Sequence, residues 1–204
     1  MKCESCGLHD CYGGEDCFEL RKRSLSAYGD PETLALTRAA TALESRYYNR
    51  LTRLEEIMRF AEEMGWSHLG IAFCIGLAEE AKVLAEAQKP RFEVTAACCK
   101  VAGIEKEALS LDKIDPERTE AMCNPAAQAL HLNDAKTDLN LVVGLCVGHD
   151  IIFSRYSDAP VTTLVVKDRV LAHNPVGALQ SGYWRKKLGL DARGRRPKDA
   201  PPPA

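Results

Sequence analysis

The stretch "LGIAFCIGLAEEAKVLAEAQK", residues 69–89, joins an apolar run to an amphipathic one and decides the fold class. Residues 69–74 are short and apolar, which is typical of a buried β-strand. Residues 76–89 place apolar and charged side chains at helical spacing and stop before Pro90, which cannot continue a helix. A strand that leads directly into a helix predicts an α/β fold.

The same alternation continues along the chain and predicts the sheet. Further strands are expected at residues 92–98, 139–146 and 161–166. Helices are expected at residues 118–131, with a start signal at Asn124-Pro125, and at residues 148–156. Strands separated by helices predict a mainly parallel, Rossmann-like sheet with flanking helices and right-handed crossovers.

Composition and capping signals divide the chain into four parts. Asp30-Pro31-Glu32 is a helix start signal, and a second helical stretch stops at Gly65, a typical C-cap. The residues after 188 show no apolar periodicity and are rich in proline and charge. The predicted parts are a cysteine-rich metal-binding head (1–29), a helical segment (30–66), an α/β domain with cysteines at its strand ends (67–187) and a disordered tail (188–204).

The overall composition excludes several classes of protein. The 204 residues are 46% hydrophobic and 27% charged, and the formal net charge is -2. The chain therefore has no net positive charge that would attract nucleic acid. The longest apolar run, residues 139–147, is about half of a bilayer span, and the N-terminus lacks the pattern of a signal peptide. We therefore expect a cytoplasmic protein with no nucleic-acid or membrane partner. Nine cysteines in such a chain favour metal binding or redox chemistry over disulfides.

Four of the cysteines are crowded into the first seventeen residues. Cys3, Cys6, Cys11 and Cys17 follow the pattern C-x2-C-x4-C-x5-C, with glycines between them that allow tight wrapping. Thiolates held this close repel one another unless a cation neutralises them. Structural zinc sites usually join two C-x2-C knuckles, and only one is present here, so the spacing favours a 4Fe-4S cluster over zinc. Free or disulfide-bonded cysteines are the alternative without metal.

A second group of cysteines is predicted at the sheet. Cys74, Cys98 or Cys99, and Cys146 each fall at the C-terminal end of a different strand, where α/β folds bind their ligands. Cys123 precedes a helix start, which favours a thiolate. Together these thiols predict a second metal centre with sulfur ligands, iron-sulfur or zinc. A reactive thiol without metal and ordinary core packing are the alternatives.

Polar residues near these cysteines are candidates for catalysis and binding. His149 and Asp150 stand at a predicted helix start just after Cys146 and could act as general acid and orienting carboxylate, although an aspartate there also fits a simple cap. The charged run "VVKDRVLAHNP", residues 165–175, fits a solvated turn. A clamp for the carboxylate or phosphate of a substrate is its alternative interpretation.

Several long motifs together resemble a known family. They are "GIAFCIGLAEEA", "CCKVAGI", "MCNPAAQALHLNDAKTDLNLVVGLCVGHD" and "TTLVVKDRVLAHNPVGAL". Over residues 1 to 180, the chain resembles the bacterial and archaeal family called domain of unknown function 1847, whose members are commonly labelled metal-binding. The resemblance implies the following cysteine ligand positions: Cys3, Cys6, Cys11, Cys17, Cys74, Cys99, Cys123 and Cys146. It implies no reaction.

These observations predict a cytoplasmic metal-binding protein of the iron-sulfur type. Its second, cysteine-lined centre at the sheet edge would serve a redox or small-molecule role, with an electron-transfer partner or a small-molecule substrate. The alternative is a zinc-binding or metal-handling protein without catalytic activity. Whether the protein is an enzyme, and its oligomeric state, stay open.

Overall fold

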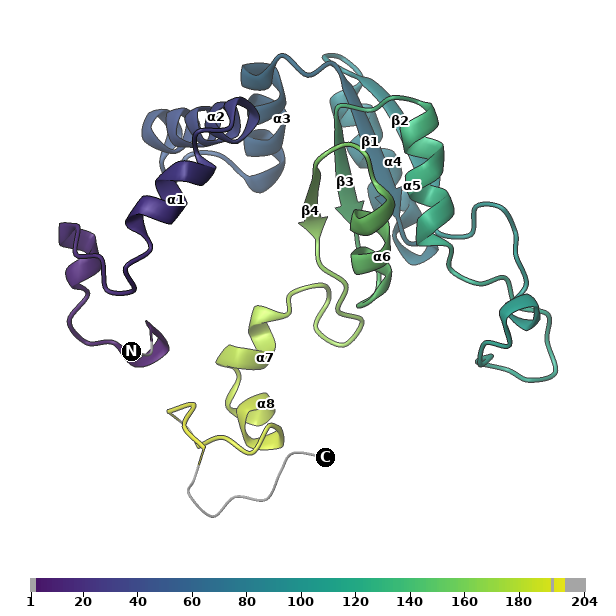
Figure 1. Cartoon of the computed structure of the whole chain (residues 1–204). Helices are drawn as coiled ribbons and strands as arrows, with labels where there is room; N and C mark the ends of the chain where they lie inside the picture. Colours follow the sequence, from purple (N-terminus) through teal and green to yellow (C-terminus); the bar gives the residue numbers. More distant parts are fainter. Residues whose placement is uncertain (1–2, 192, 197–204) are drawn as a thin grey trace. The chain divides into compact units, whose positions relative to one another are not determined.

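Four short apolar runs form one parallel sheet. In a computed structural model, which describes residues 3–191 and 193–196, the strands are β1 (His68–Phe73), β2 (Glu93–Cys98), β3 (Leu139–Val143) and β4 (Val161–Val165). All pairings are parallel, in the order β2-β1-β3-β4 (Figure 1). All five residues of β3 are buried, as expected for an inner strand covered on both faces. The predicted α/β class with a parallel sheet and flanking helices is confirmed.

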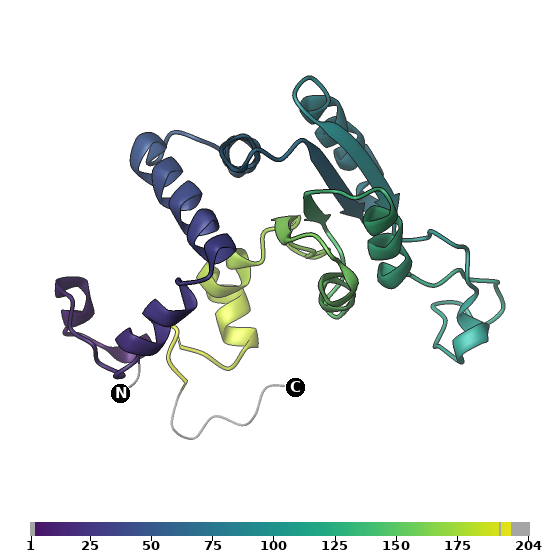
Figure 2. The same cartoon turned by 45° about the horizontal axis from the view of Figure 1, so that its top comes forward.

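The strand order reverses at β1. The chain passes from β1 to β2 on one side and then returns across β1 to β3 and β4. Because such crossovers are right-handed, α4 (Ala78–Gln88) covers one face, and α5 (Pro125–Asp134) and α6 (His149–Tyr156) cover the other (Figure 2). The connections that leave β1 and β3 therefore diverge and leave a crevice at the carboxyl ends of these strands.

A buried polar contact fixes β1 against β3. Gly70 pairs with Asn140, and a Cβ at Gly70 would lie 1.9 Å from Asn140 Oδ1. The Asn140 amide is fully buried, accepts from Thr137 Oγ1 at 2.8 Å and donates to Ser157 Oγ at 2.8 Å. Glycine at position 70 thus makes room for a side chain whose polar atoms are satisfied.

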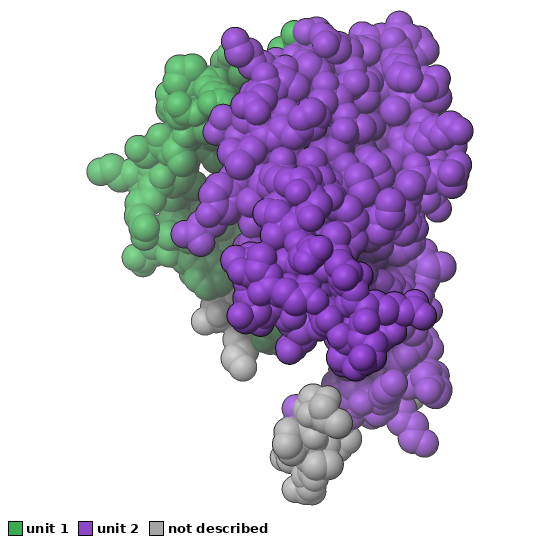
Figure 3. Space-filling view, turned by 90° about the vertical axis from the view of Figure 1, so that its right-hand side faces the viewer, with its two compact units in different colours: residues 1–65 green, residues 66–204 purple. Residues whose placement is uncertain are grey.

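The chain divides into two compact units, residues 1–65 and residues 66–204 (Figure 3). Within the first unit, α2 (Pro31–Tyr47) begins at the Asp30 cap and α3 (Arg53–Met64) ends at Gly65, as the sequence predicts. These two helices pack together, and Arg46 forms an ion pair with Glu63 at 3.2 Å. The short helix α1 (Arg21–Ala27) precedes them.

Some element boundaries differ from those predicted. Helix α5 begins at Pro125 and not at residue 118, because Asn124 Oδ1 accepts from Ala127 N at 3.0 Å and caps the helix there. Residues 100–122 form an irregular segment with one short 3-10 helix, Lys106–Leu109. Two short helices, α7 (Val176–Gln180) and α8 (Gly182–Lys187), follow β4.

Two further predictions concern the C-terminus and membranes. The tail predicted for residues 188–204 falls partly on residue 192 and residues 197–204, which lie outside the described residues. Among the helices that the structure describes, each is too short or too polar to cross a bilayer.

Candidate metal centres and the sheet-edge cleft

Backbone hydrogen bonds hold Cys74 and Cys99 at the carboxyl ends of neighbouring strands. Cys74 follows β1 directly, and its N–H donates to Val143 O at 3.1 Å. Cys99 follows β2, and its N–H donates to Phe73 O at 2.9 Å. Both cysteines thus extend the strand ladders by one residue and lie side by side.

The other two cysteines of the group reach the same edge through loops. The N–H of Asn124 donates to Cys99 O at 2.8 Å, which places Cys123 next to Cys99. Cys146 lies just beyond β3, in the turn that starts α6, and its carbonyl accepts from His149 N at 2.9 Å. The structure therefore brings Cys74, Cys99, Cys123 and Cys146 to one edge of the sheet.

The buried side chain of Gln128 on α5 is hydrogen-bonded to the ends of both strands that carry Cys74 and Cys99. Its Nε2 donates to Phe73 O at 3.1 Å and to Ala97 O at 2.7 Å. These carbonyls belong to β1 and β2 near Cys74 and Cys99. Gln128 thus ties α5 to both strands beneath the two thiols.

The thiols interact with one another and with cations. Cys99 Sγ accepts from Ile75 N at 3.3 Å and is hydrogen-bonded to the thiols of Cys74 and Cys123. Cys146 Sγ accepts from Arg169 Nη2 at 3.1 Å. The pKa of Arg169 is raised mainly by this bond to Cys146, with smaller effects from Cys74 and Cys123. Arg169 therefore lies within electrostatic reach of three thiols of the group.

Burial and neighbouring groups shift the pKa values of Cys99 and Cys74 in opposite directions. Burial raises the pKa of Cys99 to about 12, and the nearby Cys123 and Cys74 add to the effect. Burial also raises the pKa of Cys74, but hydrogen bonds from the Gly76 N–H and from Lys167 outweigh it, so the net pKa is lowered. Thiols crowded in this way cannot all ionise without a cation among them.

A cleft of about 740 Å³ lies at this edge, and we call it the sheet-edge cleft. Three of the four cysteines, Cys74, Cys123 and Cys146, line it. Leu109, Leu111 and Ile114 of the irregular segment form an apolar wall, and the polar lining residues are Lys100, Lys106, Asp112, Glu120, Asn124, His149 and Arg169. The size and the mostly apolar lining are those of a small-molecule site.

His149 and Asp150, the predicted catalytic pair, have different surroundings. His149 lines the sheet-edge cleft, and its pKa is lowered by burial and by the nearby Lys100 and Arg169, while Asp150 opposes the shift. The lowered pKa favours the neutral form of the imidazole. Asp150 Oδ1 accepts from Gly148 N at 3.0 Å and from Ile151 N at 2.8 Å, so this carboxylate also holds the start of α6.

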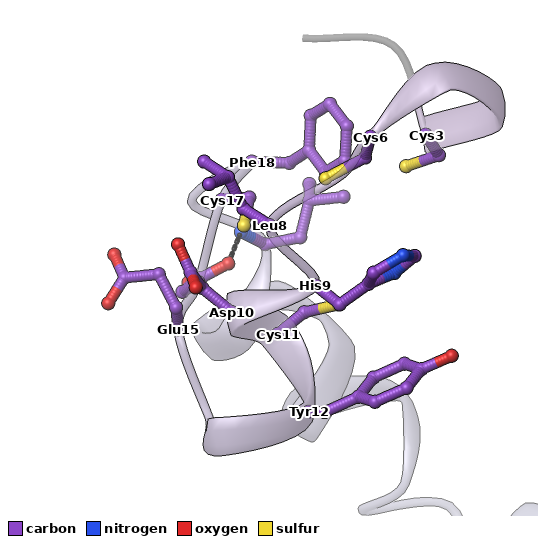
Figure 4. A pocket seen from close by; sticks show the side chains of 12 residues that line it. Cys3, Cys6, Leu8, His9, Asp10, Cys11, Tyr12, Glu15, Cys17 and Phe18 are labelled. Carbon is purple, nitrogen blue, oxygen red and sulfur yellow. Dashed lines mark hydrogen bonds between the residues drawn. The ribbon is translucent and has the colours of Figure 1, made fainter.

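Residues between Cys3 and Leu20 line a hollow of about 480 Å³ (Figure 4). Cys3, Cys6, Cys11 and Cys17 all line it, and none of the described residues up to 17 is buried. The pKa of Cys6 is lowered by hydrogen bonds from the N–H groups of His9 and Leu8. Partial burial raises the pKa of Cys17, and the charges of Cys11 and Glu15 add to this.

Neither cysteine group has the geometry of a finished metal site in the described part of the chain. Across residues 3–191 and 193–196, no three Cys, His, Asp or Glu side chains stand close enough to form a finished metal site. All nine cysteines are free thiols. The metal-ligand and catalytic assignments therefore stay predictions, and the structure supplies the positions of the side chains.

The apolar wall and Lys100 were missed by sequence reasoning. Their segment carries charged residues and no clear periodicity, so it resembles an ordinary connection. Its length between β2 and α5 was the available signal, because long connections in compact domains are often functional. The exposed Ile114, with 90% of its surface accessible, marks it in the structure.

Comparisons with known proteins agree with the resemblance in the sequence. The family model "Protein of unknown function (DUF1847)" matches residues 14–164, a narrower range than the expected 1 to 180. The chain is 48% identical over 189 residues to "Uncharacterized protein MJ0455" of Methanocaldococcus jannaschii, which covers 92% of this chain and 98% of that protein. No solved structure matches. The chain therefore belongs to the DUF1847 family of proteins of unknown function.

Proposed function

We propose that this chain is an iron-sulfur protein whose second centre, at the sheet edge, acts on or senses a small molecule in the sheet-edge cleft. The observation that carries the proposal is the placement of Cys74, Cys99, Cys123 and Cys146, from four separate parts of the chain, at one edge of the sheet. Ordinary core packing does not require four thiols at the one edge where Rossmann-like folds bind ligands.

The surroundings of the thiols suit bound metal. A cluster with four thiolate ligands carries net negative charge, and proteins compensate it with cations and with N–H groups that donate to sulfur. Lys167 and Arg169 supply the cations here, and Ile75 and Gly76 supply N–H donors. The donor set contains only sulfur, which favours soft metals over magnesium or calcium.

The spread of the four ligands favours a cluster over a single zinc ion. Cys99 contacts Cys74 and Cys123, whereas Cys146 is bound to Arg169. Zinc draws its four sulfurs to about 2.3 Å from one point. A 4Fe-4S cluster binds one thiolate at each iron, so its four sulfur ligands can stand farther apart than those of a single zinc ion.

The cysteine-rich head is proposed to hold a centre of its own. The N–H groups of Leu8 and His9 donate to the Cys6 thiol, an arrangement that favours a thiolate and orients it as a ligand. Because none of the described residues up to 17 is buried, a metal would supply the cohesion that an apolar core gives elsewhere. This centre would relay electrons to a partner or rigidify the segment.

Metal and sulfide analysis of anaerobically purified protein tests the proposal. We expect iron and acid-labile sulfide in equal amounts, about four of each per centre, with broad visible absorbance that bleaches on reduction. Zinc without sulfide and without colour would replace the iron-sulfur assignment by a zinc-binding protein without redox chemistry. Protein that binds neither metal would refute both.

A further inference from the structure

The apolar wall of the sheet-edge cleft consists of large apolar side chains that are exposed to solvent. Leu109 is 60% exposed and Ile114 is 90% exposed, and Ile75, which also lines the cleft, is 53% exposed. Apolar side chains gathered around one cleft are unfavourable in water and typical of a ligand site. They suit a ligand with a hydrocarbon body.

Two cations line the sheet-edge cleft together with His149. They are Arg169 and Lys100, and both lower the pKa of this histidine. Arg169 donates Nη2 to Cys146, and a guanidinium has five N–H donors in total. Lys100 Nζ donates to Ala121 O, and an ammonium has three donors. Each cation thus has donors left for a ligand.

The charged residues that line the cleft favour a ligand with a small negative charge. Lys106 is paired with Glu120 at 2.9 Å, so this pair cancels. Arg169 and Lys100 share the cleft with the carboxylate of Asp112 and with the thiols of Cys74, Cys123 and Cys146, and Arg169 already donates to Cys146. The positive charge left for a ligand is therefore small, which favours a singly charged carboxylate over a phosphate ester with up to two negative charges. A carboxylate also fits the planar fork of arginine.

We propose that the sheet-edge cleft binds a small organic carboxylate with an apolar body. The carboxylate lies between Arg169 and Lys100 beside His149, and the hydrocarbon lies against Leu109, Leu111 and Ile114. This inference deepens the proposed function, on which it rests for its role, by naming the class of small molecule next to the sheet-edge cysteines.

Calorimetric titration of the full chain under anaerobic conditions tests the ligand class with hexanoate, acetate, 1-hexanol and hexyl phosphate. We expect hexanoate to bind at least about tenfold more tightly than the other three. Equal binding of 1-hexanol would overturn the need for an anion. Tighter binding of hexyl phosphate would overturn the carboxylate, and no binding of hexanoate would overturn the proposal as a whole.

Variants locate the binding site. Lys100→Gln and Arg169→Gln should each weaken hexanoate binding about tenfold or more, while Lys100→Arg should preserve it. Arg155→Gln on the exposed side of α6 makes the same change of charge and should leave binding unchanged. Ile114→Ser should weaken hexanoate binding and leave acetate binding as it is. Equal losses in Arg155→Gln and Lys100→Gln would refute a local site.

Metal and sulfide content, measured on the same samples, separates the two proposals. Lys100 Nζ donates to a backbone carbonyl and lysine is not among the proposed metal ligands, so Lys100→Gln should keep its full metal content. Full metal content without hexanoate binding in the unaltered chain would refute the ligand assignment alone. Absence of metal together with hexanoate binding would refute the proposed function alone.

Discussion

Cys98 and Cys99 are neighbours in the sequence with different surroundings in the structure. Cys99 is buried, interacts with the thiols of Cys74 and Cys123 and accepts from the Ile75 N–H, whereas Cys98 is half-buried at the end of β2. Cys98 packs against the same apolar cluster to which Cys99 belongs. Alternation along a strand predicts that adjacent side chains face opposite sides of the sheet. The sequence alone could not decide which of the two thiols faces the other cysteines, because a small bend at the end of the strand would exchange their directions.

This difference gives a matched test. Cys74→Ser should remove most of the metal of the sheet-edge centre, because it deletes a proposed ligand. Cys98→Ser makes the same chemical change at a half-buried position and should keep the metal content of the unaltered protein. Metal analysis of both variants measures this directly. Equal retention in both would exclude Cys74 as a ligand.

Gly144 shapes the turn between β3 and Cys146. Its φ is 64°, a conformation that favours glycine, and a Cβ there would lie 2.0 Å from Leu77 Cδ1. We expect Gly144→Ala to lower the free energy of unfolding by about 1–3 kcal/mol, measured by urea denaturation. Gly76→Ala is the control, since a Cβ at Gly76 meets no atom within 4 Å, and it should change stability by less than about 0.5 kcal/mol. Similar losses in both variants would contradict the packing argument.

At the level of elements, the strands and most helices follow from local pattern, and the connections do not. β1 to β4 and the starts of α2 and α6 lie within a few residues of their predicted positions because short apolar runs and caps are local signals. The strand order β2-β1-β3-β4 depends on contacts far apart in the sequence, which no local pattern encodes. The cysteines at the strand ends were predictable because they adjoin these local signals. The apolar wall that lines the cleft was not, because it belongs to a connection without such a signal.

Helix α3 offers a test of local capping in the first unit. Thr52 Oγ1 accepts from Glu55 N at 3.3 Å, and Glu55 Oε2 accepts from Thr52 N at 2.8 Å, which is a complete capping box. Thr52→Ala should destabilise the start of α3 by about 1 kcal/mol, seen as faster amide hydrogen exchange there. Thr37→Ala within the exposed face of α2 should leave exchange in α3 unchanged. Unaltered exchange in Thr52→Ala would show that the box contributes nothing.

The same capping box predicts a pH dependence. The pKa of Glu55 is held below its usual value by hydrogen bonds from the Thr52 N–H and hydroxyl. A lowered carboxylate pKa contributes stability above the unfolded-state pKa of about 4.3, and this is lost as the pH falls through the folded-state pKa. Protection of the first turn of α3 should therefore be constant near neutral pH and fall toward pH 3. Protection that rises on acidification would contradict the assignment.

At the scale of the whole molecule, the two cysteine groups belong to different compact units, so their metal centres should be separable. Cys6→Ser or Cys11→Ser should release about one centre and make the first twenty residues sensitive to protease, because none of residues 3–17 has a buried side chain. The second unit should stay folded, with a protease-resistant fragment that begins near residue 66. Loss of both centres in either variant would contradict two independent sites.

The most direct test of the central claim is the metal content of a chain that lacks the four cysteines of the head and keeps those of the second unit. The variant Cys3→Ser, Cys6→Ser, Cys11→Ser and Cys17→Ser removes every thiol of the first unit and leaves Cys74, Cys99, Cys123 and Cys146 in place. Purified without oxygen, it should retain one centre per chain, with about four iron and four sulfide. A folded variant that binds no metal would contradict the claim that these four cysteines form a metal site.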